Sequence, residues 1–183
     1  MVTLCSLGFG QIDEEYSKKI REYTTEPFFL TDLVDTLPSS KTVPTPEKYL
    51  GYVVGAPNVL TYASKCADYL RELEKKSKRV KVVSLGRSEE GREMVVAIIS
   101  DEANLENINR LRTYNHFLGD PRDLFNYKRG EKMASGSSPG SDPSDWSDRD
   151  RKADEIIDKA LPFYWATGGM HAPESGPPEM IME

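Results

Sequence analysis

The sequence predicts an α/β fold in which helices cover a sheet, and three observations support this. The chain has 183 residues, which is enough for one domain with a hydrophobic core. Its composition, with 38% hydrophobic residues and a mean hydropathy of −0.57, is typical of a soluble globular protein. Segments with helical periodicity alternate with β-branched segments, which is the order expected when helices pack on a sheet.

The first 58 residues are expected to form an extended segment that wraps around the rest of the chain. Residues 11–23 could form a short exposed helix, because Ile12, Tyr16 and Ile20 are spaced by four and share one face. The segment that follows is interrupted by prolines, each of which disfavours a helix through the residue before it. These prolines are Pro27, Pro38, Pro44, Pro46 and Pro57.

The middle of the chain predicts a helix followed by two strands. Residues 61–78 repeat apolar side chains at spacings of three and four, which predicts an amphipathic helix. Residues 79–85 alternate around valines, and residues 93–100 (EMVVAIIS) are a β-branched run typical of an inner strand. Between them, residues 86–92 (GRSEEGR) are expected to form a hairpin-like loop, with the glycines providing backbone freedom.

The second half of the chain predicts two helices, a polar insertion and a strand. Residues 104–117 and 153–160 have helical patterns. Residues 128–151 are rich in Gly, Ser, Pro and Asp, so we expect a flexible surface insertion. Residues 163–167 (FYWAT) are mostly apolar and predict a buried strand. His116 has no acidic or cysteine neighbour at ligand spacing and is expected to be a structural or surface histidine.

The last predicted strand ends at two glycines, and His171 and Glu174 follow. Two prolines after residue 176 suit the first turn of a helix, which places both residues on a strand-to-helix corner. Ligands of open α/β sheets bind at such corners, and zinc accepts both imidazole and carboxylate ligands. Because HxxE is a short pattern, a surface histidine and a solvated glutamate in a loop are the alternative interpretation.

Composition excludes some classes of function. The net charge is −6, the pI is about 5.1 and no basic stripe is present, so we expect no nucleic-acid partner. No stretch approaches the roughly 20 apolar residues that span a bilayer. Two cysteines far apart, Cys5 and Cys66, do not establish a disulfide, and Cys66 is expected to be a buried, inert thiol on the apolar side of its helix.

The N-terminal residues 1–11 (MVTLCSLGFGQ) are apolar and rich in small residues. They could be the end of a cleaved signal peptide, which would make the protein secreted or periplasmic, or simply a mobile terminus.

The order of these segments resembles the N-terminal part of the zinc carboxypeptidases of the M14 family. In that family a loop of the form GxSxEGR, between two strands, precedes an HxxE zinc motif. His171 and Glu174 match the two zinc ligands, and residues 24–58 look like a bacterial branch of large M14 proteins. The loop is matched by Gly86, Ser88, Glu90, Gly91 and Arg92.

The resemblance implies a three-layer α/β/α fold with a mixed sheet, of which residues 59–183 would be the N-terminal part. It implies one zinc ion held by His171, Glu174 and a later histidine, with a separate glutamate as base. The substrates would be peptide or protein C-termini, from which terminal residues are hydrolysed. A catalytic zinc with three protein ligands and one open position is suited to this chemistry.

Two departures from the family pattern affect these expectations. Pro173 stands where many members have an arginine that helps to hold the substrate. The third ligand, the catalytic base and the carboxylate-binding residues would follow Glu183, and Glu179, on the helix after the corner, does not replace that base. We therefore expect an N-terminal fragment that is inactive alone. Its truncated sheet would expose a strand edge and apolar surface, so we also expect poor solubility or self-association.

Three other functions are compatible with these motifs. A deacylase of the aspartoacylase type also uses HxxE and a later histidine, on N-acyl amino acids. A non-catalytic binding module could have kept the fold without the third ligand. A purely structural α/β domain would bind no zinc.

Overall fold

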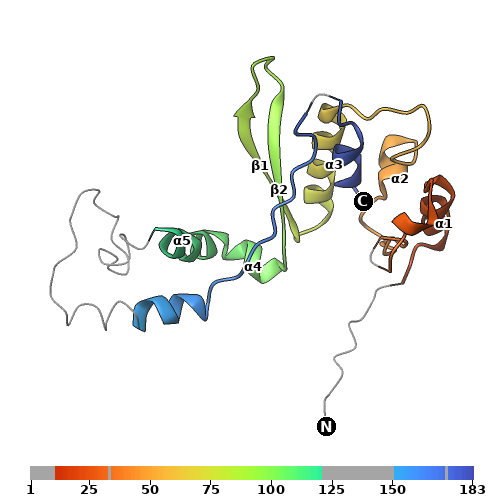
Figure 1. Cartoon of the computed structure of the whole chain (residues 1–183). Coiled ribbons are helices and arrows are strands. Elements are labelled where there is room, and N and C mark those ends of the chain that lie inside the picture. Colours follow the sequence, from red (N-terminus) through yellow and green to blue (C-terminus); the bar gives the residue numbers. More distant parts are fainter. Residues whose placement is uncertain (1–10, 33, 121–150, 172) are drawn as a thin grey trace, which may run out of the picture. The chain divides into compact units, whose positions relative to one another are not determined.

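The computed structural model describes residues 11–32, 34–120, 151–171 and 173–183 (Figure 1). These residues form two compact units, one from residues 1–100 and 166–183 and the other from residues 101–165. The mixed α/β class is confirmed. The elements are α1 (Glu14–Tyr23), a 3-10 helix η1 (Pro27–Phe29), α2 (Pro46–Leu50), α3 (Ala63–Lys76), β1 (Val80–Arg87), β2 (Glu93–Ile99), α4 (Glu102–Glu106), α5 (Ile108–Gly119) and α7 (Gly176–Met180).

The two strands predicted in the middle of the chain form the antiparallel hairpin β1–β2, which packs against α3. The register pairs Val80 with Ile99 and shifts at a bulge between Ser84 and Gly86. Glycine suits position 86 because its φ is +109°. The helix predicted at 61–78 is confirmed as α3. The predicted loop connects two antiparallel, paired strands, so it is a hairpin loop.

Hydrogen bonds from one serine close this loop. The Ser88 amide donates to the carbonyl of Arg92 at 2.8 Å, and the Gly91 amide donates to the carbonyl of Ser88 at 2.8 Å. The Arg92 amide also donates to Ser88 Oγ at 3.2 Å. Gly91 has a φ of +74°, so the second glycine of the GxSxEGR pattern serves the turn itself.

The N-terminal segment is held by partly buried polar contacts. The predicted helix at 11–23 is confirmed as α1. Its N-cap is Asp13, whose carboxylate accepts the Tyr16 amide at 3.0 Å. Ser17 is fully buried, donates to the Asp13 carbonyl at 2.6 Å and accepts the Leu37 amide at 3.1 Å. Lys19 pairs with Glu47 at 2.8 Å, which joins α1 to α2.

The hydrophobic core of this unit lies around α3. Cys66 and Tyr69 of α3 pack with Val54 of the preceding loop and with Met182, which follows α7. Residues far apart in the sequence thus share one core, and Figure 1 shows α7 beside α3. Cys66 is a free, buried cysteine as predicted, and burial, aided by the nearby Glu179, raises the pKa of its thiol.

The second unit contains α4 and α5, which replace the single helix predicted at 104–117. The helix breaks at Asn107, whose φ of −103° is not helical and whose side-chain amide donates to the carbonyl of Ala103 at 2.8 Å. His116 is exposed on α5, as expected for a surface histidine. Residues 151–157 are helical, close to the helix predicted at 153–160. The insertion predicted at 128–151 lies, apart from residue 151, outside the described residues.

The prediction of a buried strand at 163–167 is wrong, because these residues have no regular secondary structure. Phe163, Tyr164 and Trp165 are 73%, 93% and 62% exposed. A strand forms only when its backbone pairs with a neighbour, and the sheet within the described residues consists of β1 and β2 alone. The apolar composition of this segment therefore did not determine its conformation.

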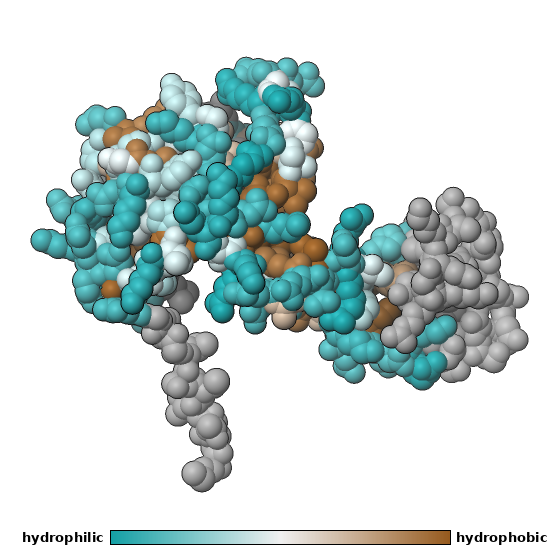
Figure 2. Space-filling view, turned by 180° about the vertical axis from the view of Figure 1, so that it is seen from behind, coloured by the Kyte–Doolittle hydropathy of each residue, from teal (hydrophilic) through white to brown (hydrophobic). Residues whose placement is uncertain are grey.

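Hydrophobic side chains of the hairpin also reach the surface. Figure 2 shows hydrophobic residues, in brown, between hydrophilic ones. Those exposed on β1 and β2 are Val83, Leu85, Met94 and Ile99. The three-layer arrangement with a mixed sheet stays a prediction, since the described sheet has two antiparallel strands.

Candidate functional site

The predicted metal ligands lie on a tight turn between residue 167 and α7. Gly168 and Gly169 enter this turn, and both are needed for physical reasons. A Cβ at Gly168 would lie 2.6 Å from Ile181 Cδ1 and 3.0 Å from the carbonyl oxygen of Pro177. Gly169 has a φ of +75°, a conformation that other residues rarely adopt. The chain can therefore pass close to the start of α7.

Glu174 is held by its own turn. The amides of Met170 and His171 donate to Glu174 Oε2 at 3.0 and 3.1 Å. The Glu174 amide donates back to the carbonyl of His171 at 3.1 Å. The His171 backbone and the Glu174 carboxylate thus belong to one hydrogen-bonded ring, with the imidazole on an exposed residue. Because Oε2 accepts both amides, Oε1 is the oxygen available to a ligand.

The helix after the turn is fixed by Glu179, which is 6% exposed. Its Oε1 accepts the Thr61 amide and its Oε2 accepts the Gly55 amide, both at 2.8 Å. Sequence reasoning placed Glu179 on this helix but assigned it no role. Its two partners are 118 and 124 residues away, so no local pattern could have revealed these contacts.

The end of the chain is also hydrogen-bonded to α1. The hydroxyl of Tyr16 donates to Glu183 Oε1 at 2.9 Å. Burial, together with the Glu183 charge, raises the pKa of the Tyr16 phenol well above its usual range. Desolvation likewise raises the pKa of the Glu183 carboxyl. Residues after α7 therefore connect the turn to the N-terminal segment.

The donor atoms of the turn fit two of the ligands of a zinc site. Imidazole nitrogen and carboxylate oxygen bind zinc at about 2.0 to 2.2 Å, and a catalytic zinc takes three protein ligands. Within the described ranges, no group of three His, Cys, Asp or Glu residues could hold a metal ion. The assignment of His171 and Glu174 as zinc ligands therefore stays a prediction.

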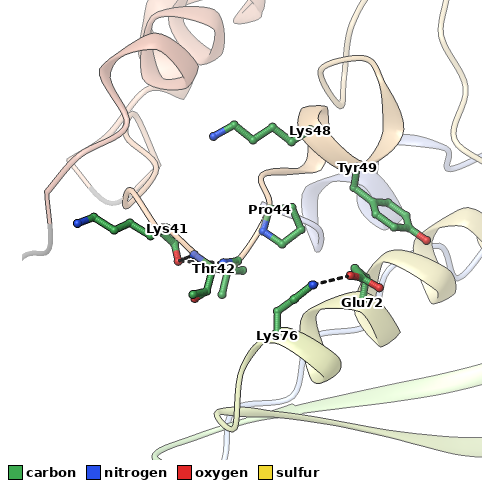
Figure 3. Close-up of a pocket in the computed structure, with 9 residues that line it drawn as sticks. Lys41, Thr42, Pro44, Lys48, Tyr49, Glu72 and Lys76 are labelled. Carbon is green, nitrogen blue, oxygen red and sulfur yellow. Dashed lines mark hydrogen bonds and ion pairs between the residues drawn. The ribbon is translucent and has the colours of Figure 1, made fainter.

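A pocket of about 310 Å³ lies elsewhere, between the N-terminal segment and α3 (Figure 3). Figure 3 shows Lys76 turned toward Glu72, and these side chains pair at 3.7 Å. The side chains of Lys41 and Lys48 extend away from that pair, so the positive groups do not converge on one point. The lining residues, which include neither predicted metal ligand, are Ser40, Lys41, Thr42, Val43, Pro44, Lys48, Tyr49, Glu72 and Lys76.

Comparison with known families shows which protein family the chain belongs to. The model of the zinc carboxypeptidase family, Peptidase M14, matches residues 66–183. This chain belongs to the zinc carboxypeptidase family. The match begins within α3 and includes the hairpin, its loop and the turn with His171 and Glu174. No curated protein and no solved structure matches the chain.

Membership confirms the resemblance seen in the sequence. Zinc carboxypeptidases are metallocarboxypeptidase-type hydrolases that act on peptides, so membership supports a metallocarboxypeptidase-like family for this chain. In the part of the chain that the structure describes, no helix is long and apolar enough to cross a membrane.

Proposed function

We propose that the chain supplies two zinc ligands, His171 and Glu174, to a metallocarboxypeptidase that hydrolyses C-terminal residues from peptides. The observation that carries this proposal is the ring of hydrogen bonds at the turn. In a member of the zinc carboxypeptidase family, the carboxylate of the HxxE pattern is already oriented by two amides, one of them from the histidine itself.

The residues of the turn have distinct roles in this proposal. The Met170 and His171 amides hold Glu174 Oε2, so the carboxylate loses little rotational freedom when Oε1 binds a metal. Once bound, zinc would polarise the scissile carbonyl and make a water acidic enough to attack near neutral pH.

The two proposed ligands do not complete a catalytic zinc site. The sequence has two histidines, His116 and His171, and a third zinc ligand, a base and a group that binds the substrate carboxylate are still required. We therefore expect the chain alone to hold zinc weakly and to lack peptidase activity. The three-layer α/β/α fold is proposed for the complete domain, and a secreted or periplasmic location is proposed from residues 1–11.

A zinc titration of the 183-residue chain tests the ligand assignment. With two histidines, the imidazole Hε1 signals in an NMR spectrum are assigned by comparison with His171→Ala. We expect zinc to shift the His171 signal, and Glu174→Gln to weaken this binding at least tenfold, because the amide oxygen is a poorer ligand than a carboxylate.

His116→Asn is the matched control, since His116 lies on α5 and is no proposed ligand. It should bind zinc as the unmodified chain does. A zinc response confined to His116, or one at His171 that Glu174→Gln leaves unchanged, would refute the ligand pair. Peptide hydrolysis above that of His171→Ala would contradict the expected inactivity.

A further inference from the structure

Glu179 combines burial with two charge-assisted hydrogen bonds. A buried carboxylate is costly unless its oxygens are satisfied, and both oxygens of Glu179 accept backbone amides at 2.8 Å. A glutamine could accept only one of the two amides, because its nitrogen is a donor. The contact therefore requires a carboxylate.

The two amides bound by Glu179, those of Gly55 and Thr61, belong to the loop between α2 and α3. Gly55 has a φ of +75°, and no atom lies within 4 Å of the position that its Cβ would take. Glycine is thus needed there for its backbone conformation rather than for space. Thr61 is buried, and its hydroxyl also lies 3.1 Å from the hydroxyl of Tyr52.

Helix α7 transmits this contact to the turn. It begins at Gly176, two residues after Glu174, so a rotation of α7 moves the Glu174 backbone. On the entering side of the turn, a Cβ at Gly168 would touch Ile181 and Pro177, and a Cβ at Gly169 would lie 3.1 Å from Pro178 Cγ. The position of α7 therefore fixes both arms of the turn, which are the segment at Gly168 and Gly169 that enters it and the segment at Glu174 that leaves it.

We propose that Glu179 is a positioning residue for the zinc turn. By fixing α7 to Gly55 and Thr61, it holds the arms of the turn at the separation that lets the Met170 and His171 amides reach Glu174 Oε2. The role in zinc binding rests on the function proposed above. The role of Glu179 in ordering the turn does not depend on that function, and it can be measured without metal.

Glu179→Gln tests this with little change in side-chain shape. We expect the Met170 and His171 amides to exchange with solvent deuterium at least tenfold faster than in the unmodified chain. We also expect zinc to bind His171 at least fivefold more weakly. Both effects follow if the carboxylate holds α7, because the amide nitrogen of glutamine would face a backbone donor.

Ser17→Ala is the matched control for a loss of global stability. Ser17 is fully buried, and its hydrogen bonds to Asp13 and Leu37 join parts of the N-terminal segment. It should lower the unfolding temperature while leaving amide exchange at the turn and zinc binding at His171 unchanged. Equal effects of both variants on the turn would overturn the proposal.

Gly55→Ala weakens the same contact from the opposite side while keeping Glu179. The added methyl group meets no atom, but the positive φ is strained for alanine, which should displace the Gly55 amide. We expect a smaller acceleration of exchange at the same two amides, and this variant decides the matter if Glu179→Gln does not fold.

The outcomes separate the two proposals. If zinc does not shift His171 in the unmodified chain, the proposed zinc function fails, while amide exchange still decides the role of Glu179. If zinc binds His171 but Glu179→Gln and Gly55→Ala leave both the exchange rates and the zinc affinity unchanged, the positioning role is refuted.

Discussion

Replacing Gly168 by alanine tests whether the entry of the turn is packed against α7. The added Cβ would lie 2.6 Å from Ile181 Cδ1, 3.0 Å from the carbonyl oxygen of Pro177 and 3.1 Å from its carbonyl carbon. The end of the isoleucine side chain can rotate away. The Pro177 backbone cannot, because it forms the first turn of α7. Relief therefore requires the turn and the helix to separate by several tenths of an ångström.

The size of the effect follows from this crowding. Inserting a methyl group into a packed site costs about 1 to 3 kcal/mol when the neighbours include backbone atoms. In a chain of this length, 1 kcal/mol lowers the unfolding temperature by about 2 to 4 °C, so we expect a decrease of about 2 to 12 °C. Thermal unfolding followed by circular dichroism measures it.

Gly176→Ala provides the control. Gly176 is the first residue of α7, and its Cβ would meet no atom within 4 Å. Alanine there should leave the unfolding temperature unchanged or raise it slightly, because alanine favours a helix. Equal unfolding temperatures for Gly168→Ala, Gly176→Ala and the unmodified chain would show that the turn does not pack on α7 as described.

Two further predictions concern ionisable groups. Burial, with a contribution from Glu183, raises the pKa of Tyr69 to about 12 from its usual 10.0, so its contribution to stability is complete below pH 10 and is lost between pH 10 and 12. Tyr69→Phe should reduce this alkaline loss of stability, measured by urea unfolding at pH 8 and pH 11. The substitution also removes a hydrogen bond to the Pro44 carbonyl that contributes about 1 kcal/mol. An unchanged loss of stability would show that ionisation of Tyr69 is not its cause. The Arg71 guanidinium, 2.6 Å from Glu93, lowers the pKa of that carboxyl, so this pair stabilises the fold above pH 4.5 and loses its effect as the pH falls through the folded-state pKa. In Arg71→Ala the Glu93 carboxyl should titrate at higher pH by NMR, and an unshifted titration would show that the pair does not form in solution.

Local patterns predicted much of the fold. The apolar repeat of α3, the two strands and the glycine loop between them all depend on residues within a few positions of one another. Cys66 was predicted to be buried because it lies on the apolar side of that repeat, and it is. The order of these elements and the HxxE pattern indicated the family that the match at residues 66–183 then showed.

Other features depend on contacts between distant residues. The apolar segment at 163–167 was predicted as a strand, but a strand also needs a paired neighbour, which composition does not supply. Gly168 was interpreted as the end of that strand, whereas the structure shows a close approach to Ile181 and Pro177.

The sequence by itself determined the helical and strand periodicity and the hairpin, because each depends on residues within a short window. The same is true of the HxxE pattern on which the proposal for His171 and Glu174 is based. Only the tertiary structure decided that Glu179 binds Gly55 and Thr61 and that two amides orient Glu174. The reason is physical: hydrogen bonds and close packing depend on distances in space, and residues more than a hundred positions apart meet only when the chain has folded.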